Sequence, residues 1–192
     1  INYKFFKQEP KKLIEIINKY NENKQIQGFE IAVSKQEEQK YLLEFAKKLK
    51  KYNYILNLHA PTLENIEQYK KYLDYAVEIS KITTQKTNIV FHPINAKNIL
   101  KSKEQTNKYV KELLKYIEQK NYEKNIELSI ENLNDIKEVK RLKKEDITDI
   151  LNQNQKLKFT YDIGHELVDK KEAKIEQNIL IERINNIHIH TH

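Results

Sequence analysis

The sequence predicts an α/β fold in which strands alternate with helices, as in a (β/α) TIM barrel. Short β-branched or aromatic runs alternate with lysine- and glutamate-rich amphipathic stretches throughout the 192 residues, and only two glycines and three prolines interrupt them. This alternation is typical of parallel βα units. We therefore expect residues 1–192 to form a single barrel domain with about seven strands, truncated at the C-terminus so that the eighth strand is missing.

The expected strands are the short apolar runs. They are Gly28–Ser34, Tyr54–His59, Asn88–His92, Ile126–Glu131, Leu157–Asp162 and Asn186–His190, with Ile1–Phe6 as a candidate first strand. The expected helices are Pro10–Asn23, Lys35–Lys51, Leu63–Ile82, Ser102–Gln119, Asp135–Asn152 and Glu166–Arg183. An open doubly wound sheet would have the same alternation. The sequence has no glycine-rich phosphate loop after its first strand, which disfavours that nucleotide-binding alternative.

Composition narrows the class of partner. The net charge of +7 is typical of some nucleic-acid-binding proteins. However, Arg141 and Arg183 are the only arginines, and arginine is the preferred residue for reading phosphates and base edges. The absence of cysteine excludes a disulfide framework and a thiolate metal site. No apolar run reaches the roughly 18 residues of a membrane span, so we expect a cytoplasmic protein without a membrane partner.

One face of each expected strand is unusually polar for a barrel. Side chains alternate inward and outward along a barrel strand, and inward positions are normally bulky and branched. Here the strands end in an imidazole or a carboxylate, at His59, His92, Glu131, Asp162 and His190. Barrel enzymes place their sites at this C-terminal edge, and buried groups of these types are costly unless they are paired or bound to metal. The pattern predicts a site for Zn²⁺ or Mn²⁺, with Co²⁺ or Fe²⁺ as alternatives.

Each strand end also has a simpler interpretation. A single strand-end histidine is more often a surface residue than a ligand, and only the five ends together favour a shared site. Glu131–Asn132 could begin a helix, because asparagine caps helices well. Asp162–His165 could be a turn in which Gly164 adopts a positive φ. The three C-terminal histidines are interrupted by isoleucine and threonine and follow a strand pattern, which disfavours a tag.

Five segments resemble strand ends of the xylose-isomerase-like TIM barrel superfamily, which joins sugar-phosphate isomerases and epimerases with endonuclease IV. In order, they are Leu58–Pro61, Val90–Pro93, Ile130–Asn132, Tyr161–His165 and Ile187–His190. The resemblance implies that Glu131, Asp162 and His190 are the shared metal ligands. It also implies that His59, His92 and His165 are the additional ligands of the multinuclear, endonuclease-like members.

The resemblance also implies a function. Glu131 is the expected catalytic residue, placed to move a proton at a carbon beside a carbonyl, as in a metal-dependent sugar or sugar-phosphate isomerase or epimerase. The alternative is an endonuclease IV-like, zinc-dependent AP endonuclease, a phosphodiesterase acting on nucleic acid. Compact loops disfavour it, since bending a duplex needs protruding loops. A third interpretation is a non-catalytic or incomplete barrel, because the superfamily's eighth-strand carboxylate has no counterpart here. The sequence leaves the oligomeric state open.

Overall fold

The computed structural model describes most of the chain from residue 26 onward. The described ranges are 26–32, 39–63, 65–96, 98–135, 141–170 and 180–189, together with Lys12, Ile14, Glu15, Asn18, Lys19 and Asn21. The expected strand Ile1–Phe6 lies outside these ranges. Within the expected helix Pro10–Asn23, five of these isolated positions are helical.

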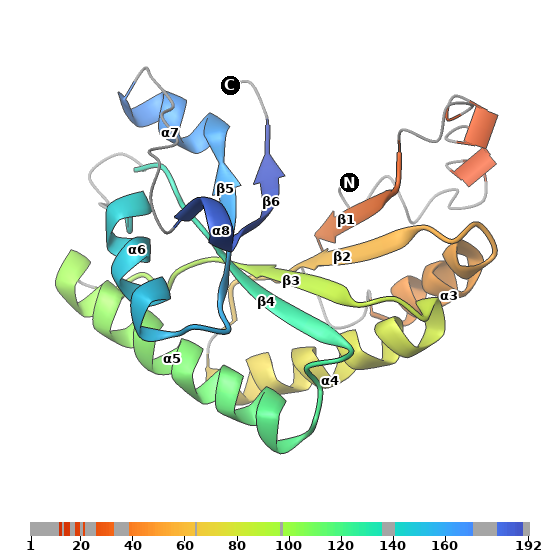
Figure 1. Ribbon diagram of the computed structural model, residues 1–192, viewed down its shortest axis with the longest axis horizontal. Coiled ribbons are helices and arrows are strands. Elements are labelled where there is room, and N and C mark those ends of the chain that lie inside the picture. Colours follow the sequence, from red (N-terminus) through yellow and green to blue (C-terminus); the bar gives the residue numbers. More distant parts are fainter. Residues whose placement is uncertain are drawn as a thin grey trace. The chain divides into compact units, whose positions relative to one another are not determined.

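Strands and helices alternate along the described chain (Figure 1). In order they are β1 (Gly28–Ala32), α3 (Gln39–Lys50), β2 (Ile55–His59), α4 (Ile66–Thr83), β3 (Thr87–Phe91), α5 (Ile99–Gln119), β4 (Ile126–Glu131), α6 (Lys144–Gln153), β5 (Lys158–Asp162), α7 (Ile163–Lys170), α8 (Leu180–Arg183) and β6 (Ile184–His188). The sheet follows chain order from β1 to β6, and β1–β2, β4–β5 and β5–β6 pair in parallel. This is the strand order of a (β/α) barrel, in which a complete ring has eight strands. The predicted fold class, an incomplete α/β barrel, is confirmed.

Two helix boundaries differ from the expected ones. The helix expected from Asp135 begins at Lys144 instead. Asp135 lies in the preceding loop, where its Oδ1 accepts from the Arg141 amide at 3.0 Å and lies 2.8 Å from Lys143 Nζ. In the region of the helix expected over Glu166–Arg183, the structure describes α7, which starts earlier, directly after β5, and α8, while residues 171–179 lie outside the described ranges. Local polar contacts, rather than apolar periodicity, set these boundaries.

The chain divides into two compact units, and the first comprises residues 1–89 and 120–127. Its described core joins β1 and β2 to α3 and α4. Phe29 makes edge-to-face contacts with Phe45 and Tyr54, with ring centroids 5.8 and 5.3 Å apart. A Cβ at Gly28 would lie 2.3 Å from Ile55 O, so the close approach of β1 to β2 requires glycine at this position.

The second unit comprises residues 90–119 and 128–192. Ile130, Phe159 and Ile147 are fully buried in its core. Arg183 is also buried, which lowers the pKa of its guanidinium, and its Nε donates to Leu157 O at 3.0 Å. This bond ties the start of β6 to the loop before β5.

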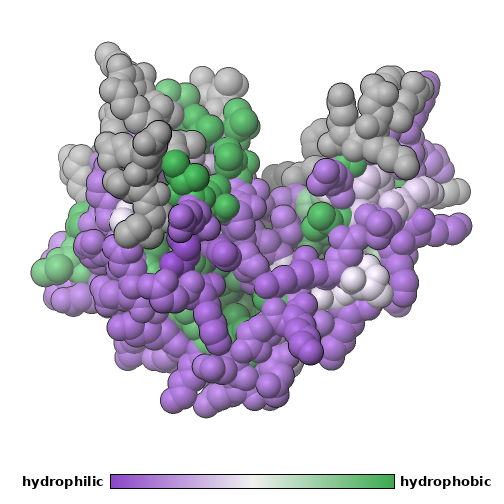
Figure 2. All heavy atoms as spheres, in the orientation of Figure 1, coloured by the Kyte–Doolittle hydropathy of each residue, from purple (hydrophilic) through white to green (hydrophobic). Residues whose placement is uncertain are grey.

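β6 is an edge strand among the described residues, and its outward side chains are exposed. Ile187 and Ile189 are 47% and 80% exposed. Figure 2 shows hydrophobic residues at the surface over β6, whereas the surface over the helices is mainly hydrophilic. No described helix is both long and apolar enough to cross a bilayer.

Candidate metal centre

Two buried carboxylates form the base of the candidate site. Glu131 ends β4 and Asp162 ends the neighbouring parallel strand β5. Only 2% of each side chain is exposed. Like charges at adjacent strand ends repel each other, and burial adds a desolvation cost, so groups that offset their charge are needed nearby.

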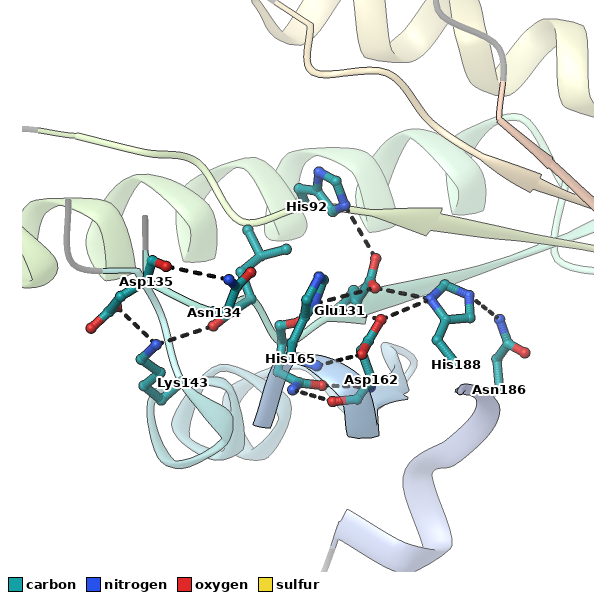
Figure 3. Close-up of polar contacts among 11 residues, drawn as sticks. His92, Glu131, Asn134, Asp135, Lys143, Asp162, His165, Asn186 and His188 are labelled. Carbon is teal, nitrogen blue, oxygen red and sulfur yellow. Dashed lines mark hydrogen bonds and ion pairs between the residues drawn. The ribbon is translucent and has the colours of Figure 1, made fainter. Parts of the chain in front are cut away.

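Three imidazoles lie around Glu131 (Figure 3). Its Oε1 is 2.9 Å from His188 Nδ1 and 3.7 Å from His165 Nδ1. Its Oε2 is 3.2 Å from His92 Nε2. The two carboxylate oxygens therefore have different imidazole neighbours. We call Glu131, Asp162, His92, His165 and His188 the acid–imidazole cluster.

Asp162 both faces these imidazoles and caps α7. Its Oδ1 accepts from the His165 backbone amide at 2.7 Å, while its Oδ2 is 3.5 Å from His165 Nδ1 and 3.6 Å from His188 Nδ1. A carboxylate at a helix N-terminus satisfies a free amide and is favoured by the helix dipole. Gly164 lies within α7, and no described glycine has a positive φ. The alternative interpretation of Asp162–His165 as a glycine turn is therefore wrong.

Asn132 connects the members of the cluster. Its side-chain Oδ1 accepts from the Asp162 amide at 2.7 Å, and its Nδ2 donates to Asp162 O at 2.9 Å. Its backbone oxygen lies 2.9 Å from His165 Nδ1. That carbonyl is an obligate acceptor, so Nδ1 donates this bond in the metal-free protein, and a cation bound at Nδ1 would displace its proton. Residues 132–135 form no helix, and the interpretation of Glu131–Asn132 as a helix start is wrong.

His188 is the imidazole that sequence reasoning did not choose as a ligand. It pairs with Asp162 in the register of β5 and β6, and Asn186 Nδ2 lies 3.2 Å from its Nε2. The predicted ligand, His190, lies outside the described residues. The alternating pattern had put both histidines on one face of the expected strand, and His188 is the one that the structure describes. The pairing of β5 with β6 shifts between Phe159 and Thr160, and this shift determines which histidine lies opposite Asp162. The sequence carries no clear signal for it.

The structure therefore brings four predicted residues into one cluster, namely Glu131, Asp162, His92 and His165. The remaining predicted ligand, His59, ends β2 in the first unit, where it pairs with Ala32 in the strand register. Asn132 and Asn186 were missed as well, because amides next to a strand end are common and carry little signal on their own.

The donor set suits a divalent cation. Glu131, Asp162 and His165 each offer a ligand atom within 4.8 Å of the others. With metal–ligand bonds of about 2.1 Å in tetrahedral geometry, neighbouring ligand atoms lie roughly 3.4 Å apart. The 3.5 and 3.6 Å separations from Asp162 Oδ2 to the two imidazole nitrogens are close to this value. Mixed imidazole and carboxylate donors favour Zn²⁺, Mn²⁺, Co²⁺ or Fe²⁺ over Mg²⁺ or Ca²⁺.

The order of the strands defines the class of fold, an α/β barrel, as the alternation of strands and helices predicted. Three solved structures show the likeness. A D-tagatose 3-epimerase-like protein matches 84% of this chain and 67% of its own, at 19% identity and a TM-score of 0.61. The 3-keto-D-glucoside 4-epimerase YcjR from E. coli, in its apo form, matches 88% and 71%, at 13% identity and 0.58. SacUVDE matches 89% and 62%, at 14% identity and 0.54.

These likenesses establish the fold, and the chain spans roughly two thirds of the length of each structure. No family model matches the sequence, and no curated protein matches it.

Proposed function

We propose that the protein is a metal-dependent sugar or sugar-phosphate isomerase or epimerase. One observation carries this proposal: two buried strand-end carboxylates, Glu131 and Asp162, face the imidazoles of His165 and His188 at ligand spacing. The names of two structurally similar proteins, both epimerases or epimerase-like, support a sugar substrate.

The proposed cation is Zn²⁺ or Mn²⁺, with Co²⁺ or Fe²⁺ as alternatives. Glu131, Asp162 and His188 would hold it, together with His165. His190, His59 and His92 are further proposed ligands, the first two on the sequence resemblance alone. When bound, the cation would polarise the substrate carbonyl and make the neighbouring C–H bond more acidic.

Glu131 is the proposed acid–base residue. Its Oε1 faces the other ligands, whereas its Oε2 is directed to His92, so one oxygen can bind metal while the other accepts a proton. Glu131 would take the proton from the carbon beside the carbonyl. For isomerisation it would return that proton to the former carbonyl carbon, whereas epimerisation would need a second acid to deliver a proton to the opposite face of the same carbon. His165 Nδ1 lies 3.5 Å from Asp162 Oδ2 and 3.7 Å from Glu131 Oε1, and it would give up its proton when it binds the metal.

A second candidate is a zinc-dependent phosphodiesterase of the endonuclease IV type. The 3.2 Å contact of Glu131 Oε2 with His92 favours it, because a carboxylate with separate partners on each oxygen can bridge two metal ions around a phosphate. The arginines disfavour it. Arg183 is buried and donates to Leu157 O and Asn154 O, and the Nε of Arg141 is buried. A third candidate is a barrel without catalytic activity.

Metal-loaded protein should be tested for aldose–ketose and epimer exchange over a panel of sugars and sugar phosphates in deuterated water. The proposal predicts deuterium at the carbon beside the carbonyl, lost in Glu131→Gln. The matched control is Glu127→Gln on the same face of β4, whose carboxylate pairs with Lys86 at 2.9 Å and should be dispensable for exchange.

The other candidates give different results in the same material. Cleavage of abasic-site DNA with Zn²⁺, together with more than one metal per chain, would support the phosphodiesterase and overturn the isomerase. Metal binding without exchange on any sugar and without cleavage would support the non-catalytic barrel.

A further inference from the structure

A second group of buried polar side chains lies next to the acid–imidazole cluster. Lys144 begins α6 and Glu166 lies in the first turn of α7, and their side chains are only 10% and 6% exposed. Lys144 Nζ is 3.1 Å from Glu166 Oε1. The fully buried hydroxyl of Tyr161, on β5, donates to Glu166 Oε2. We call these three residues the Lys–Glu–Tyr triad.

Each oxygen of Glu166 thus has its own partner, from a different element. Burial, and then the hydrogen bond and charge of Glu166, raise the pKa of Tyr161, so its hydroxyl stays a donor. Lys144 Nζ also lies 5.9 Å from the centre of the Tyr161 ring, within cation–π range. The triad therefore links α6, β5 and α7 through one carboxylate.

Stability is a poor explanation for this arrangement. The desolvation of a buried ion pair often outweighs its attraction, and apolar residues of similar volume are frequently as stabilising or more so. What a buried pair can supply is a defined position for the elements that carry it.

The element that most needs positioning is α7. Its described part has eight residues, fewer than an isolated helix needs to be stable, and its Leu167 and Val168 are exposed. His165 directly precedes Glu166, and neighbouring helical residues point about 100° apart around the axis. Holding Glu166 toward α6 and Tyr161 therefore fixes the rotation of α7, and with it the direction in which His165 points.

We propose that the Lys–Glu–Tyr triad is a positioning device that orients His165 for the acid–imidazole cluster. Asp162 fixes the start of α7 through the His165 amide, and the triad fixes its rotation one residue later. Together they hold His165 Nδ1 2.9 Å from Asn132 O and 3.5 Å from Asp162 Oδ2. The inference that this matters for metal binding rests on the proposed function.

The sharpest test replaces the whole triad with apolar residues of similar size, as Lys144→Met, Tyr161→Phe and Glu166→Leu in one full-length chain. Urea unfolding should show stability equal to or above that of the parent. Long-range ¹H–¹⁵N spectra of the metal-free protein should show that the His165 Nδ1 proton has lost its hydrogen-bonded shift. Co²⁺ affinity, read from its absorption spectrum, should fall roughly 10- to 100-fold, the range for residues that orient metal ligands.

Single variants keep the test decisive if the triple variant does not fold. Tyr161→Phe removes only the hydroxyl and should give the same changes in smaller measure. The matched control is Lys103→Met, which removes a solvent-exposed ion pair between α5 and α6, with Asp149, and should alter neither the His165 spectrum nor Co²⁺ affinity.

A folded triple variant with an unchanged His165 signal and unchanged Co²⁺ affinity would overturn the inference. The two readouts also separate it from the proposed function. If the parent protein binds no Co²⁺, the proposed function fails, and the imidazole spectrum of the metal-free protein still decides whether the triad orients His165.

Discussion

The acid–imidazole cluster and the Lys–Glu–Tyr triad begin at consecutive residues of β5, Tyr161 and Asp162, which point to opposite faces of the strand. Both groups bury carboxylates almost completely, but only the triad contains a permanent cation, Lys144, next to its carboxylate. The acid–imidazole cluster has two carboxylates, and its histidines carry charge only when protonated. In the Lys–Glu–Tyr triad the charge of the carboxylate is balanced by a lysine, which suits a structural role. The acid–imidazole cluster has no such lysine and is suited to bind a cation.

The largest expected effect comes from removing the lysine of the Lys–Glu–Tyr triad. Lys144→Met leaves Glu166 buried without its ammonium partner, and loss of one member of a buried pair destabilises by about 3–5 kcal/mol. Urea unfolding should show this loss. Lys103→Met, which removes an exposed ion pair, should lower the free energy of unfolding by less than about 1 kcal/mol. Equal effects for the two lysines would contradict the view that the triad is a buried ion pair.

Removing charge from the other cluster should act on metal rather than on the fold. Asp162→Asn keeps an acceptor for the His165 amide but removes the charge that faces His165 and His188. We expect Co²⁺ or Zn²⁺ affinity to fall by more than about 100-fold, which exceeds the loss for residues that only orient metal ligands. The free energy of unfolding should change by less than about 1 kcal/mol. Calorimetric titration measures the first quantity. Retained affinity would remove Asp162 from the proposed ligands.

A substitution of Asn132 tests whether metal binding depends on the hydrogen bonds that hold the Asp162 backbone. Asn132→Ala removes both side-chain bonds to the Asp162 backbone. Metal affinity should fall roughly 10-fold, as for other residues that orient ligands. Glu127→Ala, four residues earlier on the same strand, is the matched control and should leave affinity unchanged. A Kd for Asn132→Ala within twofold of the parent value would show that the clamp is unnecessary.

The smallest expected effect concerns pH. The pKa of Tyr161 is raised above its ordinary value of 10.0, so the unfolded chain loses this proton before the native protein does. Stability is therefore unaffected below about pH 10 and falls as pH rises further, by up to about 1.4 kcal/mol per pH unit for each such group. Tyr161→Phe should make this alkaline slope shallower, as followed by urea unfolding between pH 9 and 11. Tyr72 and Tyr75 keep part of the slope, because burial raises the pKa of both.

The main elements were predictable because their signals are local. The strand Ile126–Glu131 has the predicted bounds, since its alternating residues are followed by a polar segment. Glu131 and Asp162 were identified as site residues because they end neighbouring parallel strands. Their grouping with His92 follows from the strand order, and that of His165 from the start of α7 directly after β5.

What could not be predicted depends on contacts between distant residues. Lys144 looks like a surface residue in an amphipathic pattern, and only the folded chain places it against Glu166, 22 residues later. The place of His188 opposite Asp162 depends on a register shift between β5 and β6, at Asn185, that apolar periodicity does not encode. Asp135 and residues 141–143 look helical by composition but are not helical, and the side-chain contacts of Asp135 with Arg141 and Lys143 account for this.

The side chain of Asn132 has a thermodynamic consequence. Its amide makes the two hydrogen bonds that a further backbone pair would make, and so adds one rung to the ladder beyond the last residue of β4. The distance between the ends of β4 and β5 is therefore set when the chain folds. The free energy of cation binding does not have to offset the entropic cost of bringing the two strand ends together. A coordination shell of fixed width binds cations that match it and penalises those whose radius would force the strands apart.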